Sequence, residues 1–546
     1  MFRKKSPQAS IFDVGNVWPL KLDPDSYYGQ LAAVSERLFR DEEFSEFYKN
    51  SGRGRPCVPP SKLALVMLMQ FYEQLSDEKA IDNTAYNLLW AAVLRRCAGE
   101  KLCAKATLQT FRAQIIIHER LQWLLKKSIE EAKNQGLITN KELIVATDTK
   151  PILGRGAVKD TINLIADAML TLARAQAALN GEDLAQFLTN NGFERLIAPS
   201  IKGSVQIDWS DKGQQDAFLT ELVADARRLL ELVEGCDPGI KQAASLLEQI
   251  ILQDVSEKPR NGCRADASTT QDQSGSKPSD TKSASIKEGT ASGRIPSVTD
   301  PEQRHGRKSK SNLFVGSKAA LVADAPTGLI LSVDVIPGDA GDATGSVGLV
   351  EQAQANVEIP IETVLGDCAY GSVKTRQEFD RSGHRLVAKV PKQANTETFP
   401  KGDFTIDLPG PDQSLEMTRV TCPAGHLATR LNLHKDGGVT FYFDEFCTGC
   451  PLRERCTKSA HGRSLYVHPE ERMIQAAREF QKTPEGHALI RKRLIAENAL
   501  ARVGNLGIGQ ARYIGIAKTK FQVTIAAVVA NLRLAWNYAG RCARAA

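Results

Sequence analysis

The chain has 546 residues, enough for several domains, and its 42% hydrophobic and 25% charged residues are ordinary for globular proteins. Its formal net charge of +6 is small, so any attraction to a polyanion must come from local basic patches. No apolar stretch reaches bilayer length, and the basic N-terminus lacks the apolar segment of a secretory signal. An odd count of 11 cysteines argues against a fully paired disulfide framework. We therefore expect a cytoplasmic protein in a reducing compartment, with no membrane partner.

Residues 27 to about 135 carry apolar side chains at intervals of three and four residues, as in "SKLALVMLMQFYEQLSDEKA". This period predicts helices, with start signals at Pro59 and Ser61 and again at Ser76. A further helix is predicted over "TLQTFRAQIIIHERLQWLLKKSIEEA". Short helices joined by tight turns suit a helix-turn-helix DNA binder as well as a plain helical bundle, and periodicity alone favours the bundle. We assign residues 1–135 to an all-α N-terminal domain that is a candidate for DNA binding.

The period changes in "KELIVATDTK", where an apolar, partly β-branched run begins at Leu143. It predicts a buried strand that ends at Thr147 and Asp148. Two strong helical patterns follow, so residues 155–255 are expected to form a helical insert. From there to about residue 312 the sequence is too polar to bury enough surface to offset ordering entropy, which predicts a flexible linker.

The predicted linker ends in a basic run, "RHGRKSK". One interpretation is a solvated run of charges, and the other is contact with the phosphates of a nucleic acid. The sequence favours neither. We retain four of its side chains as candidate DNA contacts: Arg304, Arg307, Lys308 and Lys310.

The next segment predicts alternating strands and helices. "LFVGSKAALVAD" and "LILSVDVIPGD" predict a β-hairpin with "APTG" in its turn. A helix over "SVGLVEQAQANV" follows, capped by Asp342 or Thr344. The apolar run in "IETVLGDCAYGS" predicts a buried strand ending on Asp367, and a helix that closes at Gly383 leads to one more strand. Residues 140–395 are therefore predicted to form the first part of a mixed α/β core.

Residues 396–484 contain "CPAGH" and "FCTGCPLRERC", which bring four cysteines close together in the sequence: Cys422, Cys447, Cys450 and Cys456. A tight C-x2-C turn supplies two thiolates at once, and structural zinc requires four soft ligands in tetrahedral geometry. His426 is an alternative to one of them. Unrelated free cysteines are the alternative, which is weakened because four of the 11 cysteines fall within 35 residues. A reducing compartment also favours metal over disulfides. We predict a closed structural zinc site in a cysteine-rich insert.

The last segment, residues 485–546, is basic, and beyond residue 490 its only acid is Glu497. Arg493 precedes it by four residues, so the two share a helix face and can form a salt bridge. Alternatively, Asp148 and Asp367 at strand ends and Glu497 on a helix converge on one pair of metal ions. Two divalent cations held by carboxylates activate an attacking oxygen and stabilise the leaving oxygen of a phosphodiester. Mg²⁺ suits such a site because it takes oxygen ligands.

Six motifs together resemble those of bacterial insertion-sequence transposases of the DDE type: "PPSKLALVMLMQFYEQLSDEKA", "ATDTKPI", "SVTDPEQRHGRKSK", "VLGDCAYGS", "CPLRERC" and "RKRLIAENALARVGNLGIGQARYIGIAKTK". The resemblance covers most of the chain, and it is to the branch with an N-terminal helical domain and a cysteine cluster before the final acid. It implies an α/β ribonuclease H-like catalytic core, a mixed sheet with flanking helices. It also implies that Asp148, Asp367 and Glu497 are the catalytic triad, binding Mg²⁺ or Mn²⁺.

By the same resemblance, Arg493 matches the arginine of a signature that contacts transposon ends. The tyrosine expected three residues earlier is Ile490, and the lysine expected seven residues after the acid is Gly504. Lys518 or Lys520 is a candidate to replace that lysine. The expected DNA contacts are therefore Arg493, Lys518 and Lys520, together with the four side chains of the basic run.

The resemblance implies an enzyme whose partners are transposon-end DNA and target DNA, acting as a homodimer in the synaptic complex at the bacterial nucleoid. Water would cleave the phosphodiester, and the freed 3′-hydroxyl would then attack target DNA. Two alternatives stay open: a stand-alone metal-dependent nuclease with the same core, and a non-catalytic zinc-containing DNA-binding regulator. A Walker A phosphate loop is absent from the sequence, which argues against an ATPase.

Overall fold

The computed structural model describes residue 2 and residues 22–48, 56–233, 237–258, 283–309, 311–390, 398–410 and 413–545. Lys310, one of the predicted DNA contacts, lies outside the described residues, as do residues 259–282 of the predicted linker. None of the helices in the described ranges is long and apolar enough to cross a membrane.

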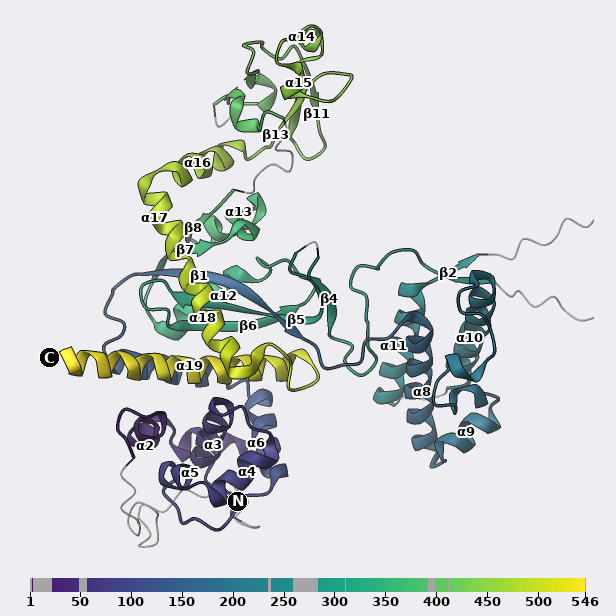
Figure 1. Cartoon of the computed structure of the whole chain (residues 1–546), viewed down its shortest axis with the longest axis vertical. Coiled ribbons are helices and arrows are strands. Elements are labelled where there is room, and N and C mark those ends of the chain that lie inside the picture. Colours follow the sequence, from purple (N-terminus) through teal and green to yellow (C-terminus); the bar gives the residue numbers. More distant parts are fainter. Residues whose placement is uncertain are drawn as a thin grey trace, which may run out of the picture.

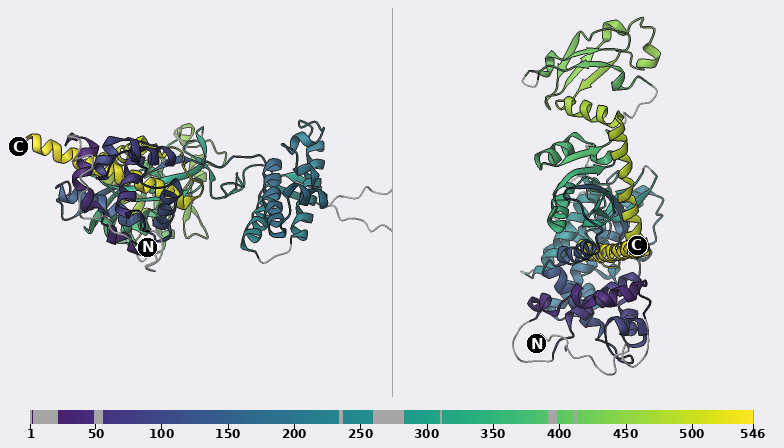
Figure 2. Two further views of the ribbon diagram at one scale, coloured as in Figure 1. Left: turned by 90° about the horizontal axis from the view of Figure 1, so that it is seen from below. Right: turned by 90° about the vertical axis from the view of Figure 1, so that its left-hand side faces the viewer.

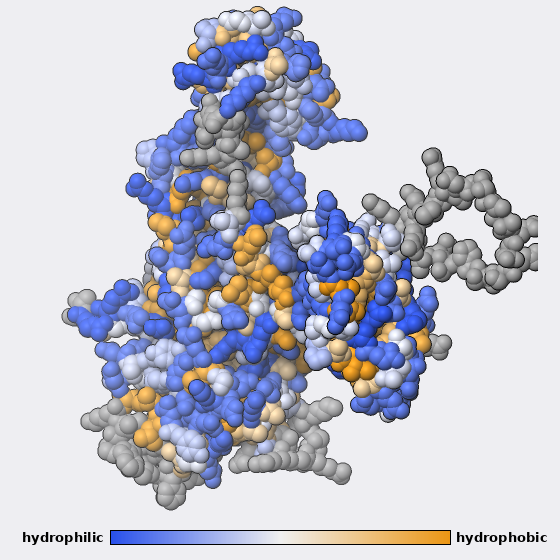
Figure 3. All heavy atoms as spheres, turned by 45° about the vertical axis from the view of Figure 1, so that its right-hand side comes forward, coloured by the Kyte–Doolittle hydropathy of each residue, from blue (hydrophilic) through white to orange (hydrophobic). Residues whose placement is uncertain are grey.

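The molecule is elongated, and its parts are stacked along the long axis (Figure 1). The N-terminal helices lie at one end, followed by the long C-terminal helix α19 (Ile516–Ala545), the main sheet and finally the cysteine-rich segment. The helical insert stands to one side of this stack, and the left view of Figure 2 shows the same separation. Hydrophilic residues cover most of the face shown in Figure 3, with smaller hydrophobic patches on both the stack and the insert.

The N-terminal helices are short, as their apolar period predicts, and Ser76 caps one of them by accepting a hydrogen bond from the Lys79 N–H. One prediction is wrong: the last helix of this region is two helices. The chain breaks at Glu119, whose φ of +52° is left-handed and cannot continue a helix. The helices are α2 (Tyr27–Leu38), α3 (Pro60–Tyr72), α4 (Asp77–Tyr86), α5 (Leu88–Val93), α6 (Lys105–Ile117) and α7 (Leu121–Asn134).

The main sheet is mixed, and its strands are β1 (Leu143–Leu153), β4 (Arg304–Arg307), β5 (Leu313–Asp324), β6 (Ile330–Pro337), β7 (Ile361–Gly366) and β8 (Arg385–Ala388). Their order is β4-β5-β1-β7-β8, and β6 also pairs with β5, beyond the part of that strand that pairs with β4. β1 is antiparallel to β5 but parallel to β7, and β7 is parallel to β8. Parallel neighbours need a crossover, which the chain supplies with the helices between them.

β1 is longer than the sequence predicts, so Asp148 lies within a strand and not at its end. Pairing with β5 continues to Leu153, which lies opposite Gly316. Pairing with β7, in contrast, stops at Ala146. Between there and Leu153, which bridges to Gln510, no described strand pairs with that side of β1, so Pro151, which has no N–H to donate, is tolerated. The expectation for Asp367 holds, since β7 ends one residue before it.

Helices α12 (Ser346–Val357), α17 (Pro484–Lys492), α18 (Leu494–Val503) and α19 pack against this sheet. Gly345 precedes α12 in a left-handed conformation, so neither Asp342 nor Thr344 caps that helix as predicted. Asn531 on α19 is fully buried and exchanges two hydrogen bonds, at 2.9 and 2.8 Å, with the backbone of Ile330 on β6. One hydrophobic core therefore joins the N-terminal helices, α19 and the sheet.

The helical insert has a hydrophobic core of its own. Its helices are α8 (Thr161–Asn180), α9 (Leu184–Asn190), α10 (Lys212–Leu232) and α11 (Pro238–Asp254). The predicted linker is wrong in its described parts. β2 (Val255–Lys258) pairs with β3 (Ser283–Ile286), and β4 belongs to the main sheet. Strand pairing supplies backbone hydrogen bonds that composition does not predict, between distant segments for β2 and β3 and between neighbouring segments for β4 and β5.

The cysteine-rich segment forms a third core built on small sheets. Its strands are β9 (Thr405–Asp407), β10 (Arg419–Thr421), β11 (Arg430–Leu433), β12 (Val439–Tyr442) and β13 (Ser464–Val467), and its short helices are α14 (Asp444–Cys447) and α15 (Arg453–Cys456). Helix α16 (Glu471–Lys482) leads from it to α17, and α17 returns the chain to β7 and β8.

Candidate active site

Three acids from distant parts of the sequence line one open cavity of about 540 Å³: Asp148, Asp367 and Glu497. β1 and β7 are parallel with Ala146 opposite Leu365, so continuing the register by two residues brings Asp148 alongside Asp367. Helix α18 packs on β1 and β5 and carries Glu497 to the same place. The cavity therefore gathers the three acids that the sequence singled out.

The environment of Asp148 disfavours a negative charge. Burial raises the pKa of Asp148 to about 6, and the nearby carboxylates of Asp367 and Glu497 act in the same direction. The Thr149 N–H, which donates to Asp148 Oδ1 at 2.8 Å, and the Arg493 guanidinium oppose this rise in the pKa. A cavity that concentrates carboxylates in this way favours cations.

Arg493 bridges two of these acids from the junction of α17 and α18. Its Nη2 lies 2.8 Å from Glu497 Oε1, and its Nη1 lies 3.8 Å from Asp148 Oδ2. The Glu497 side chain is 48% exposed, so its pair with Arg493 is worth only about 0.3–0.5 kcal/mol. The predicted salt bridge and the gathering of the three acids are thus both present, and neither excludes the other.

Basic side chains line the same cavity. Arg307 and Lys308, two candidates from the basic run, reach it because β4 pairs with the first residues of β5. Lys150, two residues after Asp148 on β1, was not predicted. The signal was available, since side chains two apart on a strand share a face, but β1 was expected to end before Lys150. Cations and carboxylates therefore alternate around one opening.

A buried ion pair completes the lining. Lys318 on β5 is 7% exposed, and its Nζ contacts Asp342 Oδ1 at 2.8 Å and donates to the Ala340 carbonyl at 2.7 Å. We expected Asp342 to serve only as a turn or cap residue, but it lines the cavity. Its position depends on the fold of the loop after β6, which the local sequence does not reveal.

The other predicted DNA contacts lie elsewhere. Arg304 donates to the backbone carbonyl of Gln303 at 2.8 Å, and so it is engaged by its own chain. Lys520 pairs with Asp334 at 2.8 Å, whereas Lys518 is exposed on α19. Among the described residues that line the cavity, neither of these lysines occurs.

The donor chemistry of the cavity suits Mg²⁺, because carboxylate oxygens are its preferred protein ligands. The spacing is looser than a finished metal site, however. The described residues contain no group of three or more His, Cys, Asp or Glu side chains placed to hold one metal ion. The three acids share a cavity without defining a single ion position.

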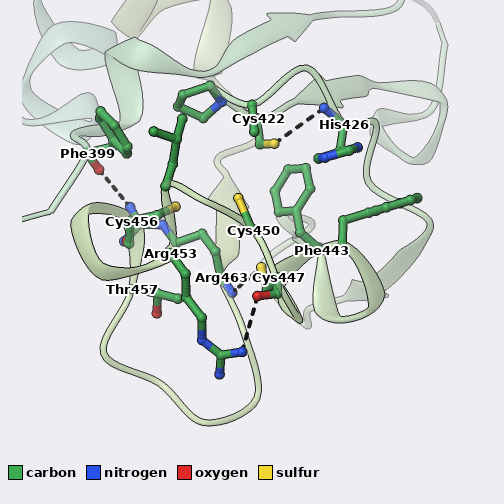
Figure 4. A pocket seen from close by; sticks show the side chains of 14 residues that line it. Phe399, Cys422, His426, Phe443, Cys447, Cys450, Arg453, Cys456, Thr457 and Arg463 are labelled. Atoms are coloured by element: carbon green, nitrogen blue, oxygen red, sulfur yellow. Dashed lines mark hydrogen bonds between the residues drawn. The ribbon is translucent and has the colours of Figure 1, made fainter.

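The four cysteines predicted to bind zinc line a second cavity of about 20 Å³, together with His426 (Figure 4). A cavity of this size holds about one water-sized atom. Backbone N–H groups donate to two of the sulfurs, from His426 to Cys422 Sγ at 3.4 Å and from Arg463 to Cys447 Sγ at 3.3 Å. Burial raises the pKa of the Cys456 thiol, with Arg463 opposing and the other three cysteines adding to the rise.

The structure does not support the zinc site as predicted, because the described residues, these four cysteines included, contain no group of three or more potential ligands placed to hold one metal ion. The ring of His426 stacks on Phe446, with centroids 4.8 Å apart. The cysteines thus form a cluster by proximity, and metal binding there stays a prediction.

The cavity thus combines carboxylates, which can bind divalent cations, with basic side chains, which can bind phosphate groups. Residues 421–535 match the family model described as "Transposase DDE domain", and residues 20–114 match the one described as "Transposase domain (DUF772)". No curated protein and no solved structure matches the chain. The two models confirm the resemblance to insertion-sequence transposases: one segment of the chain is similar to a transposase DDE domain and another to a second transposase domain.

Proposed function

We propose that the chain binds the ends of its own element and uses Asp148, Asp367 and Glu497 to cut them and to join them to target DNA. The single observation that carries this proposal is the cavity shared by these acids. The strand order also supports it, because β6-β5-β1-β7-β8, with β1 central and parallel only to β7, is the arrangement expected of a ribonuclease H-like core.

The residues of the cavity divide into two groups by charge. The three carboxylates hold Mg²⁺ or Mn²⁺, and the bound cations supply Lewis acidity for hydrolysis and strand transfer. Arg307 and Lys308 lie at the same opening, where they contact the phosphates of the DNA backbone. Arg493 holds Glu497 and Asp148 in place and shields their mutual repulsion before the cations bind.

We also propose that the N-terminal helices recognise the ends of the element and that the protein acts as a homodimer. The match of residues 20–114 to a transposase domain supports end recognition by the N-terminal helices. Several of their basic side chains are already paired with acids, including Arg37 with Glu131 and Arg95 with Glu36, both at 2.6 Å. End recognition would therefore depend on side chains outside these pairs.

The same residues fit a stand-alone nuclease, which would cut DNA but not join it. A strand-joining assay with DNA carrying both ends of the element separates the two, because only a transposase forms joined products. A non-catalytic regulator would cleave no DNA with either metal, and the cavity of three acids argues against that alternative.

The direct test is Asp367→Asn in the full-length protein. The variant keeps the shape of the side chain but loses the charge that binds a divalent cation, so cleavage of end DNA should fall by at least about 100-fold. Glu362→Gln is the matched control, because Glu362 lies on β7, the strand that ends one residue before Asp367, but is exposed and outside the cavity lining. Binding of end DNA, measured by gel shift, should persist in both. Near wild-type cleavage by Asp367→Asn would refute the assignment.

A further inference from the structure

Lys150 shares a face of β1 with Asp148, because the two are separated by one residue on a strand. Both line the cavity of the three acids. Helix α18 packs on this part of β1, with Glu497 near one end and Gly504 directly after its last residue. Seven residues on a helix are close to two full turns, so Glu497 and Gly504 lie on the same side of it. The strand thus presents Asp148 toward Glu497 and Lys150 toward Gly504.

The ammonium group of Lys150 occupies the space that a side chain at residue 504 would need. A Cβ at that position would lie 2.4 Å from Lys150 Nζ and 3.3 Å from its Cε. Non-bonded atoms do not approach to 2.4 Å, so the flexible end of Lys150 would have to move aside for a side chain at residue 504. The absence of a side chain at Gly504 is what gives the lysine its place.

The backbone does not require glycine at this position. Gly504 has φ −57° and ψ −42°, an ordinary right-handed helical conformation that any residue adopts. Replacing glycine by alanine in such a conformation usually stabilises a protein, because alanine restricts the unfolded chain. Contact with Lys150 is therefore the evident local reason for the glycine.

Lys150 also lacks the kind of acidic partner that two other cations of the cavity have. Arg493 is paired with Glu497, and Lys318 is paired with Asp342. No carboxylate of the described residues forms an ion pair with Lys150. An ammonium group held on a strand beside the acids, without a partner of its own, is suited to bind an anion that enters the cavity.

We propose that Lys150 binds a backbone phosphate of the DNA strand that lies on the three acids, and that Gly504 is glycine to leave room for it. The lysine absent from position 504 is thus supplied from the neighbouring strand. The inference rests on the proposed function, since the anion is a phosphodiester of the DNA being cut. It replaces the candidates Lys518 and Lys520, which lie outside the cavity lining.

The first experiment removes the charge and keeps the stem, with Lys150→Met in the full-length protein. Affinity for end DNA is measured at several salt concentrations. Losing one phosphate contact should reduce the slope of log K against log salt by about 0.9, and affinity at low salt should fall about fivefold. Lys141→Met is the matched control, because it removes an equal charge near the other end of β1, and its slope should equal that of the wild type.

The second experiment tests the contact between the two residues by a double-mutant cycle. Gly504→Ala should slow cleavage of end DNA about tenfold or more, because the methyl group displaces the flexible end of Lys150 from its position. In a Lys150→Ala background the space is empty, so the same substitution should change nothing further. Thermal stability should not fall in Gly504→Ala, which separates displacement of the lysine from damage to the fold.

Each outcome decides between the two proposals. An unchanged salt slope in Lys150→Met, or an equal loss in Lys141→Met, overturns the role of Lys150. Additive effects of Lys150→Ala and Gly504→Ala in the double-mutant cycle also overturn this role. If in the same assays Asp367→Asn abolishes cleavage, the proposed function survives that failure. If the wild-type protein cleaves no end DNA with Mg²⁺ or Mn²⁺, both proposals fall together.

Discussion

At the scale of single residues, Glu497 has two possible roles. It shares a cavity with two other acids, which suggests metal binding, and it forms a salt bridge with Arg493. If it binds metal, Glu497→Gln should reduce cleavage by at least about 100-fold, and adding Asp367→Asn should cost little more, because residues that act as a unit are non-additive. If it serves only Arg493, stability should fall by about 0.5 kcal/mol or less and cleavage should persist. A cleavage assay beside a thermal melt distinguishes these results.

The sequence contains enough to single out the acids but not to find the residues around them. Glu497 stands alone in a basic segment, and Asp367 ends an apolar run, so both were identified from local patterns. Lys150 was missed because an apolar run marks only the buried part of β1, while the strand continues as long as β5 pairs with it. Asp342 was missed because only the folded loop brings it to Lys318.

At the scale of elements, α4 is tied to the rest of the molecule by a half-buried ion pair. Asp77 on α4 contacts Arg112 on α6 at 2.7 Å, and the Arg112 guanidinium lies 4.9 Å from the ring centroid of Tyr513. Burial alone would raise the pKa of Asp77, but hydrogen bonds from Arg112 and Gln70 outweigh it and lower the pKa to about 2. The ionised carboxylate therefore contributes to folding.

The sign of the pH dependence follows from that lowered pKa. The contribution is complete above the unfolded-state pKa of about 3.9 and is lost as the pH falls toward 2. Because the pair is partly solvated, we expect about 1 kcal/mol. Asp77→Asn should lower stability by that amount at pH 7 and by much less near pH 2, measured by denaturant unfolding at both values. An equal difference at both would show that the charge is not the cause.

A second prediction at the scale of elements concerns zinc binding by the cysteine-rich segment. If the four cysteine sulfurs bind one zinc ion, purified protein should contain about one zinc per chain. Removal of the zinc by a chelator should then unfold this segment, because metal binding and folding are coupled in small sites. Cys450→Ser should then lose the metal, whereas Cys542→Ser, at an exposed cysteine near the C-terminus, should not. Equal metal content in both variants would leave the cysteines as ordinary packing residues of this small core.

Element boundaries were the least predictable part of the fold, for a consistent reason. Glu119 breaks a segment whose apolar period runs on unchanged, and β4 forms in a stretch too polar to suggest a strand. In both cases the boundary depends on backbone conformation or strand pairing, which composition and apolar period do not report. The helical insert was predictable because its helices bury a strongly periodic apolar face against one another.

At the scale of the whole molecule, the described residues form three hydrophobic cores, and one of these cores joins regions that were predicted as separate domains. The N-terminal helices share one hydrophobic core with the sheet through α7 and α19. The helical insert has a separate core, and Asp254 of α11 pairs at 2.6 Å with Arg294, which lies in the segment between β3 and β4. A unit that shares a core unfolds with its neighbours, whereas one with its own core can open alone.

This arrangement of cores predicts which substitutions destabilise distant elements and which have only local effects. Leu125→Ala on α7 and Leu172→Ala on α8 each remove a fully buried leucine, and each should cost about 2–5 kcal/mol locally. Hydrogen exchange measured by mass spectrometry should show faster exchange in β5, β6 and α19 for Leu125→Ala, because these elements belong to the shared core. Leu172→Ala should accelerate exchange in α8, α10 and α11 alone. If Leu125→Ala loosens only the N-terminal helices, then they form an independent domain, and recognition of DNA ends and catalysis are joined by a linker and not through a common core.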